Sequence, residues 1–324
     1  MKKHTSIQPP NLEDFIKITK KDLEEKIADM ISDEQIVSIL AGGKRLRSLL
    51  ALLSFKTCTQ GEETPRQYQK ALEGGVVIEI AHAASLVHDD IIDNDKERRG
   101  KPALYVKAGV ANAILTGHKM LIMGFKIALK HGGDWVNLYV GSWEEIVNGE
   151  HDELRFNIDS ISKKGIPSKS KIFEIYKKII TLKTAALFSS ACKAGAIEGN
   201  KSDDIIQIFE DYGREIGLAY QLADDLVDLA NGEMIDSVVL PLLNRLEDNG
   251  GKINVLKKRK IKKEFAKKED KIKEVYIKEI KEHIQRAKKL GGSKLIPNSH
   301  YKSLLAEFPR HVINEMLKEI NIAV

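Results

Sequence analysis

The sequence predicts an all-α protein built as a single domain, and three observations support this prediction. Helical patterning is almost continuous along the chain, whereas strand signals are scarce. Only 8 prolines occur in 324 residues, and most of them fall at breaks between the helical stretches. Apolar residues make up 42% of the chain, enough for a sizeable core, and charged residues make up 31%. We therefore expect one domain over residues 1–324, without a linker.

Each expected helix follows a run of apolar periodicity and ends near a residue that caps or breaks helices. Ser202 can cap a helix start, and Gly199-Asn200 and Gly291-Gly292 suit helix ends. The expected ranges are 12–30, 44–57, 66–95, 109–130, 134–156, 168–198, 202–229, 260–290 and 301–322.

Charge and composition argue against several other classes of protein. The formal net charge of +5 gives no reason to expect a nucleic-acid partner. The two cysteines, Cys58 and Cys192, lack metal-type spacing, so a reducing compartment is the simplest interpretation. Residues 1–11 lack the apolar stretch of a secretion signal, and no uncharged apolar run reaches the ~18–20 residues of a membrane span. We expect a cytoplasmic protein with no transmembrane segment.

Two clusters of aspartates share the spacing i, i+1, i+4 within apolar, helix-like sequence. Positions i and i+4 lie on one face of a helix, where like charges cost roughly 0.2–0.5 kcal/mol per pair. Two such clusters indicate cations that offset the repulsion, and ligands that are all oxygen suit Mg²⁺, which also binds water and substrate phosphates. The clusters are Asp89, Asp90 and Asp93, and Asp224, Asp225 and Asp228.

Basic residues accompany the acidic clusters in three places. Arg98 and Arg99 follow the first cluster, and a site with both signs of charge suits a phosphorylated ligand, since metals bridge carboxylate to phosphate and arginine binds phosphate oxygens. A surface ion-pair patch is the alternative.

The other two places have weaker signals. Gly42-Gly43 precede an expected helix start at which Lys44 and Arg47 share a face, and a helix N-terminus with cations binds anions. An ordinary loop is the alternative. Lys183-Thr184 lies within an apolar run, where a lysine can also extend its charge to the surface.

In this order, the motifs resemble those of the trans-type polyprenyl diphosphate synthases, the isoprenyl chain-elongating prenyltransferases such as geranylgeranyl and farnesyl diphosphate synthases. The resemblance runs from about Gly42 to Pro241. It implies the isoprenoid synthase fold, a bundle of about ten or more helices around a central cavity, and a homodimer. It also implies Mg²⁺-dependent head-to-tail condensation of isopentenyl diphosphate with an allylic diphosphate, by ionisation, condensation and elimination, with product release at a membrane surface.

The resemblance implies metal-binding roles for both clusters. Asp89 and Asp93 would hold Mg²⁺ on the allylic diphosphate from one wall, with Asp90 in support. Asp224 would hold a further ion from the opposite wall, and Asp225 and Asp228 complete that motif, partly through water. Up to three Mg²⁺ ions are expected with substrate bound.

The resemblance also implies roles for the cationic and polar residues. Arg98 and Lys183 would bind the allylic diphosphate, and Thr184 and Gln221 would face the developing carbocation with their oxygens. Packing alone is an alternative role for His82, which lies two helical turns before Asp89. The expected isopentenyl diphosphate ligands are Lys44, Arg47, His82 and Arg99.

Small residues before the first cluster predict a long product. In this family, aromatic side chains four or five residues before the first aspartate block the product's path, and Ser85 and Ala84 stand at those places. The expectation is a product of about twenty carbons or more, with twenty-five to thirty-five plausible. On the next helix, alternative stoppers are His118, Met120, Leu121 and Phe125.

Three places depart from the family pattern. Ser48 replaces a proline, and Gly117-His118 replaces Gly-Asp. After the second cluster, the loop over 229–241 lacks two lysines, which predicts an altered cover over the diphosphate. Two rival functions therefore remain, a regulatory subunit of a heteromeric prenyl synthase and a terpene cyclase. A lysine-rich run over 249–289 suits either a solvated helix face or contact with an anionic membrane.

Overall fold

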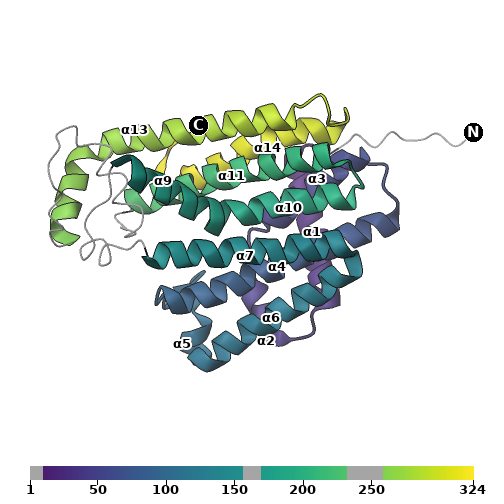
Figure 1. Ribbon diagram of the computed structural model, residues 1–324, viewed down its shortest axis with the longest axis horizontal. Helices are drawn as coiled ribbons and strands as arrows, with labels where there is room; N and C mark the ends of the chain where they lie inside the picture. Colours follow the sequence, from purple (N-terminus) through teal and green to yellow (C-terminus); the bar gives the residue numbers. More distant parts are fainter. Residues whose placement is uncertain (1–9, 156–168, 232–257) are drawn as a thin grey trace, which may run out of the picture. The chain divides into compact units, whose positions relative to one another are not determined.

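The computed structural model describes residues 10–155, 169–231 and 258–324, and almost every element in this part of the chain is a helix (Figure 1). The all-α prediction is therefore confirmed. The elements are α1 (Leu12–Met30), α2 (Glu34–Leu40), α3 (Leu46–Thr59), α4 (Pro65–Ile92), β1 (Glu97–Arg98), β2 (Lys101–Pro102), α5 (Leu104–Ala108), α6 (Val110–His131), α7 (Gly133–Arg155), α9 (Lys169–Ile180), η1 (Thr181–Ala185), α10 (Ala186–Glu198), α11 (Asp203–Ala230), α13 (Lys258–Gly291), α14 (His300–Leu317) and η2 (Lys318–Ile320).

Helix boundaries agree with the sequence patterns where a cap is present. Thr64 forms a capping box with Gln67 at the start of α4, and Asn200, with a φ of 53°, follows the end of α10. The range 168–198, expected as one helix, is instead three consecutive segments, because Thr181–Ala185 adopts a π-helix between α9 and α10. Short elements such as α2, α5 and the β1–β2 hairpin escaped the periodicity argument because each spans too few residues to show a period.

The described chain divides into two compact units, so the single-domain expectation stays a prediction. Unit 1 consists of the described parts of Met1–Val140, Ser190–Glu210 and Gly291–Glu307. Unit 2 consists of the described parts of Gly141–Ser189, Asp211–Leu290 and Phe308–Val324.

In unit 1, α4 is the central helix and packs along α6 and α3 (Figure 1). Glycines permit close approach on several sides of α4. A Cβ on Gly74 would lie 2.5 Å from the ring of Trp135, and one on Gly75 would lie 2.8 Å from Leu23. The faces of α4 are therefore packed closely enough to set its rotation and hence the direction of its C-terminal aspartates.

In unit 2, a buried cluster joins α9, α11, α13 and the C-terminal part of the chain. It includes Tyr176, Ala219, Ile280 and Ile313, each almost fully buried. α11 also approaches η1 closely, since a Cβ on Gly217 would lie 2.5 Å from the Cα of Ala185. This packing places the second aspartate cluster beside the segment that carries Lys183-Thr184.

Candidate active site

The first aspartate cluster occupies the last turn of α4, and its middle member is turned into the protein. Asp90 is 4% exposed and accepts hydrogen bonds from Arg98 Nε at 2.8 Å and Arg98 Nη2 at 2.5 Å. Burial raises the pKa of Asp90 above its ordinary value, although Arg98 acts in the opposite direction. Asp89 is half-buried and Asp93, the C-cap of α4, is exposed. Successive helical residues point about 100° apart, so Asp89 and Asp93 share a face that Asp90 leaves.

The two arginines of the hairpin turn go to different places. Arg98 pairs with Asp90, whereas Arg99 Nη1 donates to Ala41 O at 3.0 Å and Ile39 O at 3.5 Å. Their divergence follows from the turn, in which Arg99 has a φ of 55° and Gly100 a φ of 72°. A two-residue hairpin thus connects the first cluster to the backbone just before Gly42.

The Gly42-Gly43 segment is a turn, and the helix that follows begins later than expected. Arg45 is the N-cap of α3 and adopts a left-handed conformation with a φ of 62°, while Lys44 is exposed ahead of the helix. The prediction that Lys44 and Arg47 share a helical face is therefore wrong, because Lys44 lies outside the helix. Gly43 has no room for a side chain, since a Cβ there would lie 2.7 Å from Arg45 Nη1.

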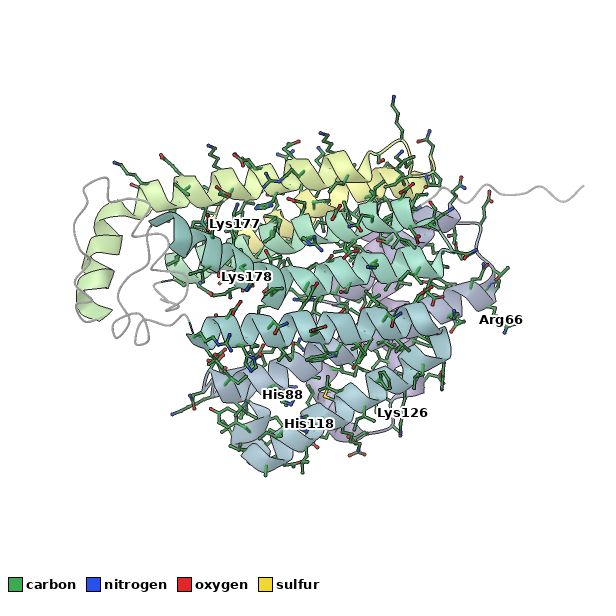
Figure 2. All side chains as sticks on the ribbon, in the orientation of Figure 1. Arg66, His88, His118, Lys126, Lys177 and Lys178 are labelled. Carbon is green, nitrogen blue, oxygen red and sulfur yellow. The ribbon has the colours of Figure 1, made fainter. Side chains whose placement is uncertain are left out.

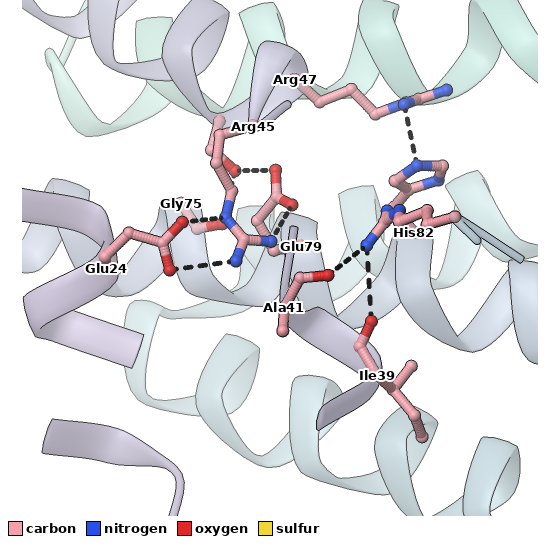
Figure 3. A network of polar contacts seen from close by, with 10 residues as sticks. Glu24, Ile39, Ala41, Arg45, Arg47, Gly75, Glu79 and His82 are labelled. Carbon is pink, nitrogen blue, oxygen red and sulfur yellow. Dashed lines mark hydrogen bonds and ion pairs between the residues drawn. The ribbon is translucent and has the colours of Figure 1, made fainter. Parts of the chain in front are cut away.

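Arg45 crosses the interior of unit 1 and ties three helices together (Figure 3). It donates to both carboxylate oxygens of Glu24 at 2.9 and 3.1 Å, and to Glu79 Oε2 at 3.0 Å. Ser48 Oγ lies 2.8 Å from Glu79 Oε1 and 2.8 Å from Gly75 O. Ser48, which replaces the proline of the family pattern, thus hydrogen-bonds to the second carboxylate oxygen of Glu79. Glu79 is 3% exposed.

Arg47 and His82 lie together beside this network. Arg47 Nη1 donates to His82 Nε2 at 3.1 Å, so the imidazole acts as the acceptor. Burial, with Arg47 and Arg99 nearby, holds the pKa of His82 well below its ordinary value. A neutral histidine beside guanidinium groups leaves a net positive local charge, as an anion site requires, and His82 Nδ1 is buried without a hydrogen-bond partner.

The Gly117-His118 departure places a second imidazole beside His88. The two rings, from α4 and α6, have centroids 5.4 Å apart (Figure 2). Gly117 makes room for His88, because a Cβ there would lie 2.4 Å from His88 Nε2. Two of the alternative stoppers differ in burial. His118 is exposed and its ring lies beside that of His88, whereas Met120 is fully buried. Before the first cluster, both Ala84 and Ser85 are buried as well.

The second aspartate cluster repeats the pattern of the first. Asp225 is 1% exposed, and its two carboxylate oxygens accept hydrogen bonds from the Tyr176 hydroxyl and from Gln221 Nε2, the latter at 2.9 Å. Burial, together with the neighbouring carboxylates Asp224 and Asp228, raises the pKa of Asp225 to about 7 against the effect of these two donors. Asp224 and Asp228 are half-buried.

Lys183 and Thr184 lie in the π-helix η1, and their side chains reach different helices. Lys183 Nζ is 2.9 Å from Glu150 Oε1 and 2.6 Å from Glu153 Oε2 of α7. Thr184 Oγ1 donates to Gln221 Oε1 of α11 at 2.6 Å. π segments within helices often occur at functional sites.

Two glycines, one on α7 and one on α11, lie close to this π segment. A Cβ on Gly149 of α7 would lie 2.8 Å from the backbone nitrogen of Lys183, and Gly217 of α11 approaches Ala185. The π segment therefore lies where the backbones of α7 and α11 both come close to it.

In unit 1, Arg98 thus hydrogen-bonds to Asp90 of the first cluster, and Arg47 hydrogen-bonds to His82. Unit 2 joins the second cluster to Lys183, Thr184 and Gln221. Sequence reasoning missed the residues that support these groups, and no local signal identifies them, because their partners are distant along the chain. They are Glu24, Arg45, Glu79, Glu150, Glu153 and Tyr176. Residues 232–241 of the loop that lacks two lysines, and the lysines over 257–263, lie outside the residues whose side chains are described.

The donor set fits Mg²⁺ better than a metal held by the protein alone. Among the residues whose side chains are described, no group of three or more histidine, cysteine, aspartate or glutamate side chains is arranged to hold a metal. Mg²⁺ usually takes one or two carboxylates and completes its shell with water and substrate phosphates. Asp89 with Asp93, and Asp224 with Asp228, are each such a pair of oxygen donors.

No helix in the described parts of the chain combines the length and apolar character needed to cross a bilayer. An open hollow on α13 is lined by charged residues such as Lys278 and Arg286.

Comparisons with known proteins agree with these features. A short chain isoprenyl diphosphate synthase of Methanothermobacter thermautotrophicus is 35% identical over 223 residues, which cover 65% of this chain and 64% of the relative. The chain spans about three fifths of the length of the curated relatives that it matches.

Solved structures share the fold. A geranylgeranyl pyrophosphate synthetase from Pyrococcus horikoshii has a TM-score of 0.75 at 24% identity, with 93% of this chain and 98% of that chain covered. A polyprenyl synthase from Caulobacter crescentus, complexed with calcium and isoprenyl diphosphate, has a TM-score of 0.72 at 21% identity, with 94% and 97% covered. The family model for polyprenyl synthetases matches residues 30–287, so this chain belongs to the polyprenyl synthetase family.

Proposed function

We propose that this protein condenses isopentenyl diphosphate with an allylic diphosphate, head to tail, to make a linear trans-polyprenyl diphosphate. The observation that carries the proposal is the arrangement shared by the two clusters. In each, the middle carboxylate is buried and bonded to protein groups, while the flanking two, at i and i+4, are more exposed. Two carboxylate pairs, each fixed by an inner aspartate, suit the binding of metal ions that carry a diphosphate.

The metal proposed for both clusters is Mg²⁺, with up to three ions when substrate is bound. Asp89 and Asp93 would hold it at the first cluster, and Asp224 and Asp228 at the second. When bound, Mg²⁺ supplies positive charge that stabilises the departing diphosphate. Asp90 and Asp225 keep the flanking carboxylates in position.

The remaining residues have separate tasks in this proposal. Arg98 and Lys183 bind the allylic diphosphate once it competes with their present carboxylate partners, and both are charged donors suited to phosphate oxygens. Thr184 and Gln221 present oxygen dipoles to the allylic cation. For isopentenyl diphosphate, the ligands are Lys44, Arg47, His82 and Arg99.

The bonding changes balance without a dedicated side-chain base. The allylic carbon–oxygen bond breaks and its electron pair leaves with diphosphate. The double bond of isopentenyl diphosphate then supplies the electrons of the new carbon–carbon bond. The proton lost from the adjacent carbon goes to the released diphosphate. The chain's own residues orient the reactants and stabilise charge as it develops.

The proposed product has about twenty carbons or more, because the small residues Ser85 and Ala84 stand four and five positions before Asp89, where an aromatic side chain would block the product's path. The full chain, Mg²⁺ and labelled isopentenyl diphosphate should be incubated with allylic primers of several lengths, and the products sized. D89N should lower kcat by about 100-fold or more, whereas D134N, an exposed aspartate outside both clusters, should not. A product that ends at fifteen carbons would contradict the proposed length.

The same assay separates the rival functions. A cyclic hydrocarbon released without its diphosphate would identify a terpene cyclase. Absence of turnover in the purified chain, restored by a partner protein, would identify a regulatory subunit. Turnover by the chain alone supports the proposed synthase.

We propose that two copies associate through α6. Leu115, Ile122 and Leu129 recur at intervals of seven residues and are 66%, 56% and 54% exposed. Apolar side chains that repeat with this period on the exposed face of a helix are typical of helix–helix association. Light scattering should show a dimer for the wild type and a smaller species for I122E.

A cytoplasmic location and peripheral membrane contact complete the proposal. Cys58 and Cys192 are free, buried thiols, as a reducing compartment allows. Exposed lysines on α13, such as Lys271 and Lys278, suit contact with anionic lipid, although a solvated helix face is the alternative. Co-sedimentation with vesicles that contain anionic lipid, and not with neutral vesicles, distinguishes the two.

A further inference from the structure

Tyr176 lies outside every motif that the sequence presents, yet its hydroxyl donates directly to the second aspartate cluster. It comes from α9, is 3% exposed, and bonds to Asp225 Oδ2. Asp225 is 49 residues away in the sequence and lies on α11. A buried hydroxyl given to a buried carboxylate is a strong, directional contact, because the surrounding protein excludes competing water.

The contact is the first link in a chain of hydrogen bonds. Asp225 Oδ1 accepts from Gln221 Nε2 at 2.9 Å, and Gln221 Oε1 accepts from Thr184 Oγ1 at 2.6 Å. The amide of Gln221 thus turns its NH₂ group to Asp225 and its oxygen to Thr184. Donation therefore converges on Asp225, directly from Tyr176 on one side and from Thr184 through Gln221 on the other.

The position of Asp225 also matters for its neighbours. Asp224 and Asp228 flank it on the same helix, and their direction depends on the rotation of α11. Gly217 already sets α11 close to η1, which fixes the distance between the two elements. The bond from Tyr176 of α9 to Asp225 and the bond from Thr184 of η1 to Gln221 add the rotational constraint, because each ties a side chain of α11 to another element.

We infer that Tyr176 is a positioning residue, which holds Asp225 so that Asp224 and Asp228 present their carboxylates to metal and Gln221 presents its oxygen beside Thr184. The inference rests on the proposed function for the identity of the metal and the substrate. Tyr176 itself touches neither. Loss of its hydroxyl leaves Asp225 Oδ2 buried without this donor, and the carboxylate then turns to find another.

The test compares Y176F with Y139F, a matched control. Tyr139 is also buried, at 8% exposure, and its hydroxyl donates to the backbone oxygen of Leu121 at 2.8 Å. Each variant loses one buried hydroxyl that donates to an acceptor on another helix, so a general effect on stability should be similar in both. Binding of Mn²⁺ in the presence of inorganic diphosphate, measured by electron paramagnetic resonance, reports on the metal sites without catalysis.

Y176F should weaken Mn²⁺ binding by about tenfold, as loss of a residue that orients a metal ligand commonly does. It should lower kcat by a similar factor with little change in KM for isopentenyl diphosphate. Y139F should alter neither. D225N, which can no longer accept at both oxygens, should reproduce the weaker Mn²⁺ binding. The double variant Y176F/D225N should then bind no more weakly than D225N alone.

Three results would overturn the inference: unchanged Mn²⁺ binding in Y176F, an equal loss in Y139F, or additive losses in the double variant. If the wild type condenses no substrate while the Mn²⁺ results are as expected, the proposed function fails and the role of Tyr176 stands. If the wild type condenses substrate but Y176F binds Mn²⁺ as tightly as the wild type, the proposed function stands and the role of Tyr176 fails.

Discussion

Arg45→Met should destabilise the protein strongly, because it leaves Glu79 in the interior without its cation. Arg45 has a side chain that is 1% exposed, and Glu79 one that is 4% exposed. In the variant, Glu79 keeps only the hydroxyl of Ser48 among its present donors. Arginine and methionine have the same difficulty at a φ of 62°, so the backbone cost cancels in the comparison.

The size of the effect follows from the exposure of the two carboxylates. Breaking a buried ion pair by removal of one partner costs about 3–5 kcal/mol, and the Arg45–Glu79 pair belongs to this class. The bonds to Glu24 add little, about 0–1 kcal/mol, because the Glu24 side chain is 45% exposed and water can replace Arg45. We expect a total loss of about 4 kcal/mol in the free energy of unfolding.

Urea unfolding at pH 7 measures this loss, with R66M as the control. Arg66 is exposed in the first turn of α4 (Figure 2), so its replacement should change stability by less than about 0.5 kcal/mol. The double variant R45M/E79L removes both charges and should recover most of the loss, because the cost lies in the unpaired carboxylate. R45M should also raise KM for isopentenyl diphosphate more than KM for the allylic substrate, because Arg45 holds the turn beside Lys44.

A loss below about 1 kcal/mol in R45M would refute the reasoning, because water or a proton would then satisfy Glu79 at small cost. A double variant no more stable than R45M would refute it as well. In that case the contribution of Arg45 would come from its packing and not from its pairing with Glu79.

Three further predictions concern the site and its surroundings. R98A should lower kcat by at least about tenfold in the condensation assay, because Asp90 loses both of the hydrogen bonds that it accepts from Arg98. If R98K restores only part of the activity, the need for two donors is confirmed. G149A should cost about 1–3 kcal/mol in urea unfolding and reduce kcat, since its Cβ would lie 2.8 Å from the backbone of Lys183; full activity would show that the π segment can shift freely. Burial raises the pKa of Glu215, but hydrogen bonds from His283 and Arg286 lower it by more, so the pKa in the folded state lies below its ordinary value. The stabilising contribution of Glu215 is therefore present above the unfolded-state pKa of about 4.3 and is lost as the pH falls through the folded-state pKa. The difference in unfolding free energy between wild type and E215Q should therefore shrink between pH 6 and pH 3, and a constant difference would contradict this assignment.

Sequence patterns were sufficient for most of the long helices and for the motifs, because both depend on residues close together in the chain. The spacing i, i+4 places Asp89 with Asp93, and Asp224 with Asp228, on common helical faces whatever the rest of the fold does. Caps such as Thr64 are equally local. Even the family resemblance rests on short motifs read in order.

Local patterns were insufficient where the backbone departs from regular geometry. The expected helix over 168–198 contains a π segment at Thr181–Ala185, which depends on close approach by other helices. The expected shared face of Lys44 and Arg47 was wrong because Arg45 is left-handed and α3 begins only at Leu46. A propensity argument has no access to either feature, since most residues avoid both conformations unless tertiary contacts impose them.

By itself, then, the sequence determined the all-α class, the helical faces and the identities of the charged groups, because helical periodicity is a property of neighbouring residues. Only the tertiary structure decided which charges are paired. Asp90 and Asp225 look like their neighbours in the sequence, but burial against Arg98 and Tyr176 separates them from the carboxylates proposed to bind metal. The physical reason is that a buried carboxylate needs donors to replace its lost water, and packing between distant segments chooses those donors.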